Sequence, residues 1–178
     1  MAHLVPEIRY TTGTCAFGVL LLAINGDGEI CAILLGDDAA GLVDDLRTRH
    51  PLAELNHAPT LLGSDLASLV DYIANPSTTT YAPNRPLAFT GTAFQLDVWK
   101  ALSQVGPGET ISYAELAHRI GKPKAVRAVA RACAANPLAI VVPCHRVLRS
   151  DGGISGYRWG VERKRQLLAL ESQLASCA

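Results

Sequence analysis

A stretch rich in Pro, Ser and Thr, from Pro76 to Pro86, separates two parts of the chain that have different sequence patterns. Residues of these types are typical of linkers, because Pro cannot donate a backbone hydrogen bond and small polar residues favour turns. The chain of 178 residues is long enough for two small lobes. We therefore predict an N-terminal lobe over residues 1–86 and a C-terminal lobe over residues 87–178.

The part before the linker has the pattern of a small α/β lobe. Residues 17–24 and 30–35 are apolar runs of strand length, and Asn25-Gly26-Asp27-Gly28 between them is a strong hairpin-turn signal. The two strands should therefore lie antiparallel in one sheet. Apolar residues then recur at helical spacing, which predicts helices over about 39–49, behind an Asp cap, and over 61–73.

The part after the linker contains residues that typically begin and end helices. Thr92 with Gln95 and Ser112 with Glu115 have the capping-box form, in which a hydroxyl and a side chain three residues later satisfy free N–H groups at a helix start. The predicted helices run over about 93–104, 113–120 and 124–135. Gly121 ends the second of them, so the last two form a helix-turn-helix.

The second helix of this pair combines cations with small residues. Lys124, Arg127 and Arg131 stand among several alanines, including Ala128. Small side chains let a helix approach a groove of a nucleic acid closely, and the cations suit its phosphates. A surface helix that packs tightly on a neighbour, with ordinary solvated charges, would have the same composition.

The formal net charge of zero hides an asymmetry along the chain. Residues 1–91 contain 4 Lys and Arg against 10 Asp and Glu, a balance of −6, whereas residues 92–178 contain 12 against 6, a balance of +6. The basic part favours a polyanionic partner, although two lobes of opposite sign would also attract each other. No apolar run approaches the roughly 20 residues of a membrane span, so no membrane is expected as a partner.

One short motif carries the most reactive group of the chain. Pro143-Cys144-His145-Arg146 follows an apolar run over 138–142, which we interpret as a buried strand. A thiol at the end of such a strand, next to an imidazole and a guanidinium, has neighbours that favour the nucleophilic thiolate. The alternative is an inert Cys at the end of a core strand, which is common in intracellular proteins.

The five cysteines are odd in number and include no CxxC pair, so neither a disulfide framework nor a zinc knuckle is predicted. This usage fits a reducing cytoplasm. His3, His50 and His57 lack the local spacing that would place them around a metal with Cys15 or Cys31, and we expect no metal site.

Three further segments, together with the Cys motif, resemble the O6-alkylguanine-DNA alkyltransferases. They are Gly91-Thr92-Ala93-Phe94-Gln95, Ile120-Gly121-Lys122-Pro123-Lys124-Ala125-Val126-Arg127-Ala128-Val129-Ala130 and Ser155-Gly156-Tyr157-Arg158-Trp159-Gly160-Val161. An Asn eight residues before Cys144 and a helix-turn-helix that bears an Arg complete the likeness. The resemblance covers nearly the whole chain and is densest from Gly91 to Glu171.

This resemblance implies a fold and an activity. The fold is α/β (α+β), with an RNase H-like N-terminal lobe around an antiparallel sheet and a mainly helical, winged-helix-like C-terminal lobe. The activity is direct-reversal DNA repair by a methylated-DNA–protein-cysteine methyltransferase, which moves an alkyl group irreversibly from O6 of guanine, and also from O4 of thymine, to its own Cys. Each molecule acts once and needs no cofactor. The partner is double-stranded DNA, contacted by a monomer through the minor groove.

The resemblance also implies catalytic roles for matching residues. Cys144 would accept the alkyl group, His145 would take the thiol proton through a water, and Glu171 would orient the imidazole. Asn136 would brace the site, and the Tyr113 hydroxyl would donate to the departing purine.

Other matching residues are implied in DNA binding and in a purine pocket. Because O6 is inaccessible inside a duplex, the nucleotide has to rotate out, and Arg127 would fill the gap. The remaining residues implied in DNA binding are Lys124, Ala128, Arg131 and Ser112. The pocket residues are Tyr113, Val147, Ser155, Tyr157, Arg158 and Trp159. Trp159, where other members have small residues, would narrow the pocket and favour methyl over bulky groups.

Two other functions compete with this one. An alkyltransferase-like protein binds the lesion without chemistry, but it lacks the Cys that stands here at position 144. A thiol hydrolase also uses Cys and His, but its imidazole comes from a distant segment of the chain.

Overall fold

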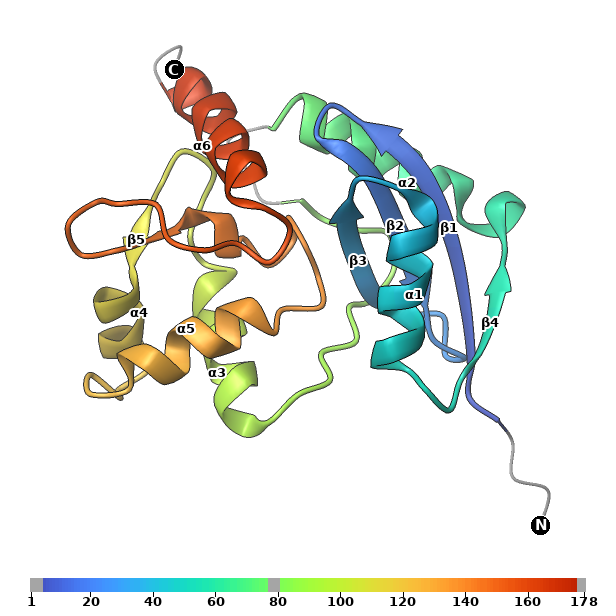
Figure 1. Cartoon of the computed structure of the whole chain (residues 1–178), viewed down its shortest axis with the longest axis horizontal. Coiled ribbons are helices and arrows are strands. Elements are labelled where there is room, and N and C mark those ends of the chain that lie inside the picture. Colours follow the sequence, from blue (N-terminus) through green and yellow to red (C-terminus); the bar gives the residue numbers. More distant parts are fainter. Residues whose placement is uncertain (1–4, 77–80, 176–178) are drawn as a thin grey trace. The chain divides into compact units, whose positions relative to one another are not determined.

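The computed structural model describes residues 5–76 and 81–175, and the chain divides into two compact units (Figure 1). Unit 1 comprises Met1–Asn75 and Ala82–Phe89, and unit 2 comprises Pro76–Tyr81 and Thr90–Ala178. The predicted boundary after Pro86 lies inside unit 1, because Ile30 donates to the Pro86 carbonyl and accepts from the Ala88 amide. Residues 77–80 of the predicted linker lie outside the described residues.

Unit 1 is built on a four-stranded sheet with the order β3-β2-β1-β4. Its strands are β1 (Glu7–Cys15), β2 (Gly18–Ile24), β3 (Ile30–Gly36) and β4 (Glu54–His57). The first three are antiparallel neighbours, and the predicted turn over 25–28 joins β2 to β3. β4 pairs parallel to β1, so the sheet is mixed, and the predicted antiparallel arrangement holds for β1, β2 and β3. The chain crosses back through helix α1 (Ala39–Arg49) before β4, and a helical crossover lets a strand enter the sheet in the parallel direction.

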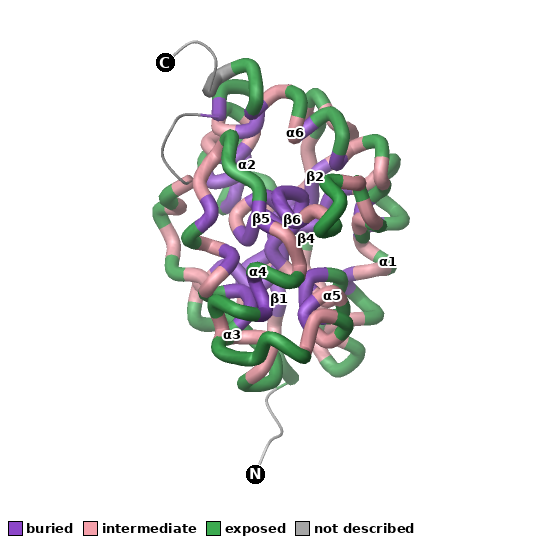
Figure 2. Tube along the Cα trace, turned by 90° about the vertical axis from the view of Figure 1, so that its left-hand side faces the viewer, coloured by how far each residue is buried: buried purple, intermediate pink, exposed green. Residues whose placement is uncertain are grey.

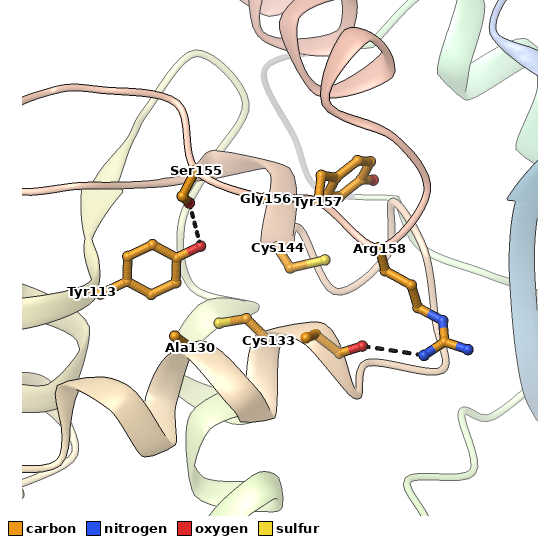
Figure 3. Close-up of a pocket in the computed structure, with 9 residues that line it drawn as sticks. Tyr113, Ala130, Cys133, Cys144, Ser155, Gly156, Tyr157 and Arg158 are labelled. Atoms are coloured by element: carbon orange, nitrogen blue, oxygen red, sulfur yellow. Dashed lines mark hydrogen bonds between the residues drawn. The ribbon is translucent and has the colours of Figure 1, made fainter.

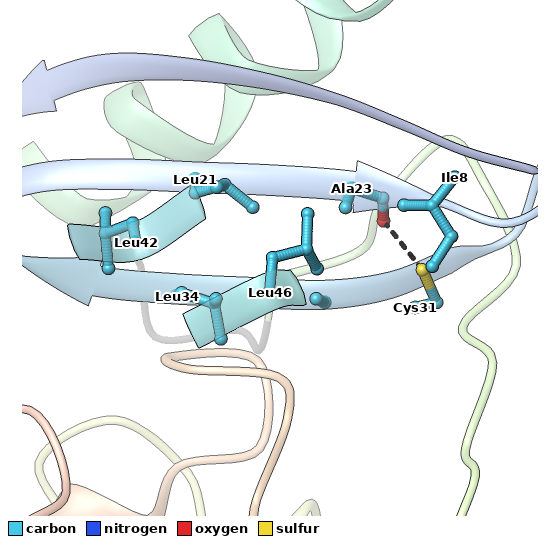
Figure 4. Packing of buried hydrophobic residues seen from close by; sticks show 8 residues of the cluster. Ile8, Leu21, Ala23, Cys31, Leu34, Leu42 and Leu46 are labelled. Carbon is cyan, nitrogen blue, oxygen red and sulfur yellow. Dashed lines mark hydrogen bonds between the residues drawn. The ribbon is translucent and has the colours of Figure 1, made fainter. Parts of the chain in front are cut away.

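The hydrophobic core of unit 1 lies against this sheet. Leu42 and Leu46 of α1 pack with Leu21 of β2 and Leu34 of β3 (Figure 4). Because side chains alternate along a strand, the neighbouring residues of β2 and β3 face the other side of the sheet, and most of these are buried as well. Helix α2 (Pro59–Ala74) packs on β1. Burial on both faces explains why β2 and β3 are continuous apolar runs.

Unit 2 is mainly helical. It contains α3 (Ala93–Leu102), β5 (Ile111–Ser112), α4 (Tyr113–Arg119), α5 (Val126–Ala134), the 3₁₀ turn η1 (Cys144–Arg146), β6 (Val147–Leu148) and α6 (Val161–Ala175). The capping box of Thr92 and Gln95 is confirmed in both directions, and the Ser112 hydroxyl accepts from the Glu115 amide. β5 and β6 pair in parallel, which brings the start of α4 beside the residues that follow η1.

Helices α4 and α5 form the predicted helix-turn-helix. Gly121 follows α4 with a φ of 70°, the left-handed conformation that glycine adopts without strain. α5 begins at Val126, later than predicted, because Lys124 belongs to the turn that the Ala125 amide closes on the Lys122 carbonyl. α3 packs against α5, so the pair is supported from one side.

The predicted α/β class is confirmed by this arrangement of elements. Figure 2 marks the buried residues in purple. They include most of β2 and β3 in unit 1 and the η1 turn in unit 2. Within the described ranges, no helix has the length and apolar character needed to cross a membrane.

Candidate active site

The apolar run before Cys144 forms a turn and not the strand that its composition predicted. The side-chain amide of the buried Asn136 donates to the carbonyls of Leu138 (3.3 Å) and Val142 (2.8 Å), and its oxygen accepts from the Leu138 amide (2.9 Å). These bonds satisfy backbone groups that a strand would pair in a sheet, so the run is buried as a turn. Ile140 has a φ of 70° there, which is strained for a β-branched residue.

Asn136 also reaches the reactive sulfur. Its side-chain amide donates to Cys144 Sγ at 3.3 Å. Cys144 is the first residue of η1, and only 4% of its surface is exposed. One side chain therefore holds both the turn and the sulfur.

The Cys144 thiol is protonated in the free protein. Burial, the largest influence, raises its pKa to about 11, and the hydrogen bond from Asn136 and the charges of Lys164 and Arg158 lower it by less. The prediction that the surroundings favour thiolate was therefore wrong for the free protein. One reason is that Arg146, a neighbour in sequence, has its charge taken up by Glu171.

A buried base stands next to the thiol in sequence, and a carboxylate orients it. His145 is fully buried, and its Nε2 lies 2.9 Å from Oε1 of Glu171 on α6. Burial lowers the pKa of His145 more than Glu171 raises it, so the ring is neutral at pH 7. A neutral ring that donates to an ionised carboxylate carries its proton on Nε2, which leaves the lone pair on Nδ1. This Nδ1 is buried and has no hydrogen-bond partner among the described residues.

Glu171 has a second buried partner, Arg146, which the sequence analysis did not assign. Arg146 Nε and Nη2 donate to its two carboxylate oxygens at 2.9 and 2.7 Å, and Nη1 donates to the Val105 carbonyl at 2.6 Å. Burial alone would raise the pKa of Glu171, but the bonds from His145 and Arg146 lower it to about 2. The available sequence signal was an Arg directly after an apolar run and before Val147 and Leu148.

A further cation, Lys164 on α6, was also not identified from the sequence. It is fully buried, and its Nζ donates to the Val147 carbonyl at 2.5 Å. Burial lowers its pKa, whereas the thiols of Cys144 and Cys133 raise it by less. In the sequence it stands between Arg163 and Arg165, so it resembles part of a solvated charged face.

Cys144 lies in a cavity of about 430 Å³ (Figure 3). On one side the Tyr113 hydroxyl and Ser155 Oγ are 2.6 Å apart, and on the other Arg158 Nη1 donates to the Ala134 carbonyl at 3.4 Å. Burial raises the pKa of Tyr113, so its hydroxyl keeps its proton. The lining residues are Tyr113, Ala130, Cys133, Ala134, Cys144, Ser155, Gly156, Tyr157 and Arg158.

Two of the predicted pocket residues do not line this cavity. Trp159 is buried, and its ring meets the Tyr157 ring edge-on, with centroids 5.3 Å apart. Val147 is buried as well, and its carbonyl binds Lys164. Trp159 therefore does not line the cavity but packs on Tyr157, which does, and the prediction that Trp159 narrows the pocket stays a prediction.

Helix α5 connects the cavity to a basic surface. Its residues Ala130 and Ala134 line the cavity, while Val129 and Ala132 face the core. The predicted DNA-binding cations Lys124, Arg127 and Arg131 are exposed, and Ala128 is half-buried. Ser112, the remaining predicted residue of this set, caps α4. Arg127 and Arg131 of the basic face therefore share helix α5 with the reactive cavity, and Lys124 lies in the turn just before it.

Within the described ranges, no group of three or more His, Cys, Asp or Glu side chains could hold a metal ion. The His57 ring instead packs on the Tyr10 ring, with centroids 5.3 Å apart. His3, the third histidine considered, lies outside the described residues.

Comparison with known proteins shows that this chain is similar to DNA repair proteins. Residues 93–173 match the family model described as "6-O-methylguanine DNA methyltransferase, DNA binding domain". The chain is 49% identical over 166 residues to the bifunctional transcriptional activator and DNA repair enzyme Ada of Escherichia coli K12. The aligned residues make up 93% of this chain and 46% of Ada. It is 50% identical over 91 residues to the inducible methylated-DNA–protein-cysteine methyltransferase of Bacillus subtilis, over 51% of each chain.

Solved structures extend the similarity over both units. The OGT protein of Mycobacterium tuberculosis, in a crystal structure with DNA, has a TM-score of 0.78 and 35% identity, over 93% of this chain and 94% of that one. The O6-methylguanine methyltransferase of the same organism gives a TM-score of 0.76 and 33% identity, with 93% of both chains covered. By contrast, this chain spans about half the length of the curated relatives described above.

Proposed function

The chain belongs to the O6-methylguanine DNA methyltransferase family, and from this premise we propose that it transfers an alkyl group from O6 of guanine in DNA to the sulfur of Cys144. The observation that carries the proposal is the position of this thiol, in a cavity whose wall is the helix that exposes Arg127. The protein acts as a monomer on double-stranded DNA in the cytoplasm.

The first chemical task is to remove the thiol proton. The buried thiol is poorly nucleophilic until a base acts on it. His145 Nδ1 carries a free lone pair and takes the proton through a water, while Glu171 stabilises the imidazolium through Nε2. A thiol that stays protonated until this point is protected from stray electrophiles and oxidants.

The second task is displacement at the alkyl carbon. The Cys144 thiolate forms a sulfur–carbon bond while the carbon–O6 bond breaks, and guanine leaves with that electron pair. The departing purine accepts a hydrogen bond from the Tyr113 hydroxyl, which burial keeps protonated and Ser155 holds in place, while the thiol proton stays on His145. The product thioether is stable, so each protein molecule reacts once and needs no cofactor.

The third task is to bring the base into the cavity. The nucleotide has to leave the stack, at a cost of a few kcal/mol, and Arg127 occupies the space that it vacates. Alanines beside Arg127 let α5 approach the minor groove, whereas Lys124 and Arg131 bind phosphates. This mode needs little sequence information, which suits repair at any site.

Mass spectrometry of the protein after incubation with duplex DNA containing O6-methylguanine tests the proposal. We expect one methyl group per protein, located on the peptide that contains Cys144, and no methyl group on a Cys144→Ala variant that binds the same DNA. An unmodified wild-type protein in complex with the DNA would support binding without chemistry. Repeated turnover of an ester or amide would support a thiol hydrolase.

Replacing Arg127 by Ala should separate base flipping from chemistry. We expect methyl transfer from duplex DNA to slow about tenfold or more, because the Ala side chain cannot occupy the space that the flipped nucleotide vacates. A tenfold slower rate corresponds to about 1.4 kcal/mol of lost stabilisation. Transfer from the free modified base should be unchanged. Arg119→Ala is the matched control, since Arg119 is also exposed but already paired with Glu115. Equal losses on duplex and free base would refute the flipping role.

A further inference from the structure

Lys164 is a fully buried cation without a carboxylate partner in the described part of the chain. Its Nζ has one hydrogen bond to a protein atom, the 2.5 Å bond to the Val147 carbonyl. Fully buried Lys is rare in proteins unless it is paired, because removing an ammonium from water costs several kcal/mol. A Met would fill the same space at lower cost, so the ammonium requires an explanation.

The charge of Lys164 lies beside the reactive sulfur. Val147 directly follows η1, and α6 packs on η1, so the bond to the Val147 carbonyl places Nζ next to the turn that carries Cys144. The thiols of Cys144 and Cys133 are the groups whose charges act on Lys164. Lys164 in turn lowers the pKa of Cys144 against the larger effect of burial.

The other cations of the site are differently placed. Arg146 is bound by Glu171, so its charge is compensated inside the protein. Arg158 is exposed at the cavity, where water screens its charge. The remaining groups that face the sulfur are neutral at pH 7: Asn136, Cys133 of α5 and Tyr157. Tyr113 of α4 also keeps its proton.

We propose that Lys164 is a positioning residue that supplies the buried positive charge beside which the Cys144 thiolate forms. That this thiolate accepts an alkyl group from DNA rests on the proposed function, whereas the effect of Lys164 on its formation does not. As the proton moves from sulfur to His145, the new anion meets an ammonium held by the Val147 carbonyl, and a buried pair of opposite charges replaces a lone buried cation. His145 removes the proton, and Lys164 makes its removal less costly.

The test is the pH dependence of Cys144 alkylation by iodoacetamide, followed by mass spectrometry of the Cys144 peptide. In Lys164→Met we expect the midpoint of the profile to move to higher pH, and the rate below both midpoints to fall about tenfold for every pH unit by which the midpoint rises. Arg165→Met is the matched control, because it removes an exposed cation of the same helix and should not move the midpoint.

A second variant guards against a merely structural effect. Lys164→Gln keeps a donor for the Val147 carbonyl but removes the charge, so it should shift the midpoint in the same direction as Lys164→Met. Profiles of both variants that coincide with wild type would overturn the proposal. Alkylation by iodoacetamide needs no DNA, so that outcome would not contradict the proposed repair function. Conversely, a protein that failed to repair DNA would still show whether Lys164 shifts the midpoint of Cys144 alkylation.

Discussion

Replacing Arg146 by Met is expected to lower the free energy of unfolding of unit 2 by about 3–5 kcal/mol, the usual cost of removing one partner from a buried ion pair. Arg146 and the Glu171 side chain it binds are both almost fully buried. Without the guanidinium, Glu171 keeps the bond to His145 and a long contact of 3.4 Å from the Gly108 amide. The Val105 carbonyl also loses its 2.6 Å donor.

The effect should depend on pH in a definite direction. The pKa of Glu171 is lowered from 4.5 to about 2, so the carboxylate contributes its full stabilisation above about pH 4.5 and loses it as the pH falls toward 2. The neutral His145 acts in the same direction, because its lowered pKa means that the unfolded chain binds a proton first in acid. The difference between wild type and Arg146→Met should therefore shrink in acid.

Urea unfolding followed by tryptophan fluorescence measures the free energy of unfolding of unit 2, since both tryptophans, Trp99 and Trp159, belong to that unit. Arg149→Met is the matched control three residues further along. Arg149 and its partner Asp151 are each 65% exposed, and such a pair contributes about 0–1 kcal/mol. Equal losses in the two variants would contradict a dominant role for the buried pair.

The sequence predicts those parts of the fold whose signals are local. The hairpin at 25–28, the Asp38 cap of α1 and the Thr92 box of α3 each rest on a few adjacent residues, and all three are present. β1 and β4 were not predicted, because Glu7–Cys15 contains three threonines among few apolar residues, and Glu54–His57 is too short to show a pattern. Their place in the sheet depends on pairing with distant strands, which no local pattern encodes.

Prediction of the candidate site from sequence is limited in the same way, because packing depends on residues that are distant in the chain. An apolar run indicates burial, and residues 138–140 and 142 are indeed buried, but burial does not distinguish a strand from a turn. The distinction depends on Asn136, whose side chain replaces the partner strand. Arg146 and Lys164 were missed for a related reason: the sequence shows a charge but not its surroundings, and most charged residues are exposed.

Burial keeps the Cys144 thiol protonated, a property of the site that the sequence motif alone does not reveal. A thiolate in the free protein would react with small electrophiles and oxidants, and under the proposed function, in which each molecule acts once, the protein could not recover from such a reaction. A pKa of about 11 avoids this loss. The groups that can lower the cost of ionisation, His145 with Glu171 and the buried Lys164, are already held in position in the free protein.

Replacing Asn136 by Ala should have a second large effect, on stability and on alkyl transfer together. The variant leaves the buried Leu138 amide without its partner, at about 1–3 kcal/mol. The Leu138 and Val142 carbonyls each lose one of two donors, since they also accept from the Val142 and Cys144 amides, and each lost bond costs about 0.5–1.5 kcal/mol. The strained φ of 70° at Ile140 adds to the tendency of the turn to open. We expect a loss of about 3 kcal/mol or more in the free energy of unfolding.

Transfer to Cys144 should slow further than this loss of stability explains, because Asn136 also donates to the sulfur and lowers the pKa of the thiol. The rate of methyl transfer from duplex DNA, measured where the variant remains folded, checks this. Ser103→Ala is the control: its hydroxyl donates to the Trp99 carbonyl, which the Ser103 amide also satisfies, so neither stability nor rate should change appreciably. A folded Asn136→Ala protein with the wild-type rate would mean that apolar packing around Ile140 holds the sulfur in place, and that the side-chain amide serves the backbone alone.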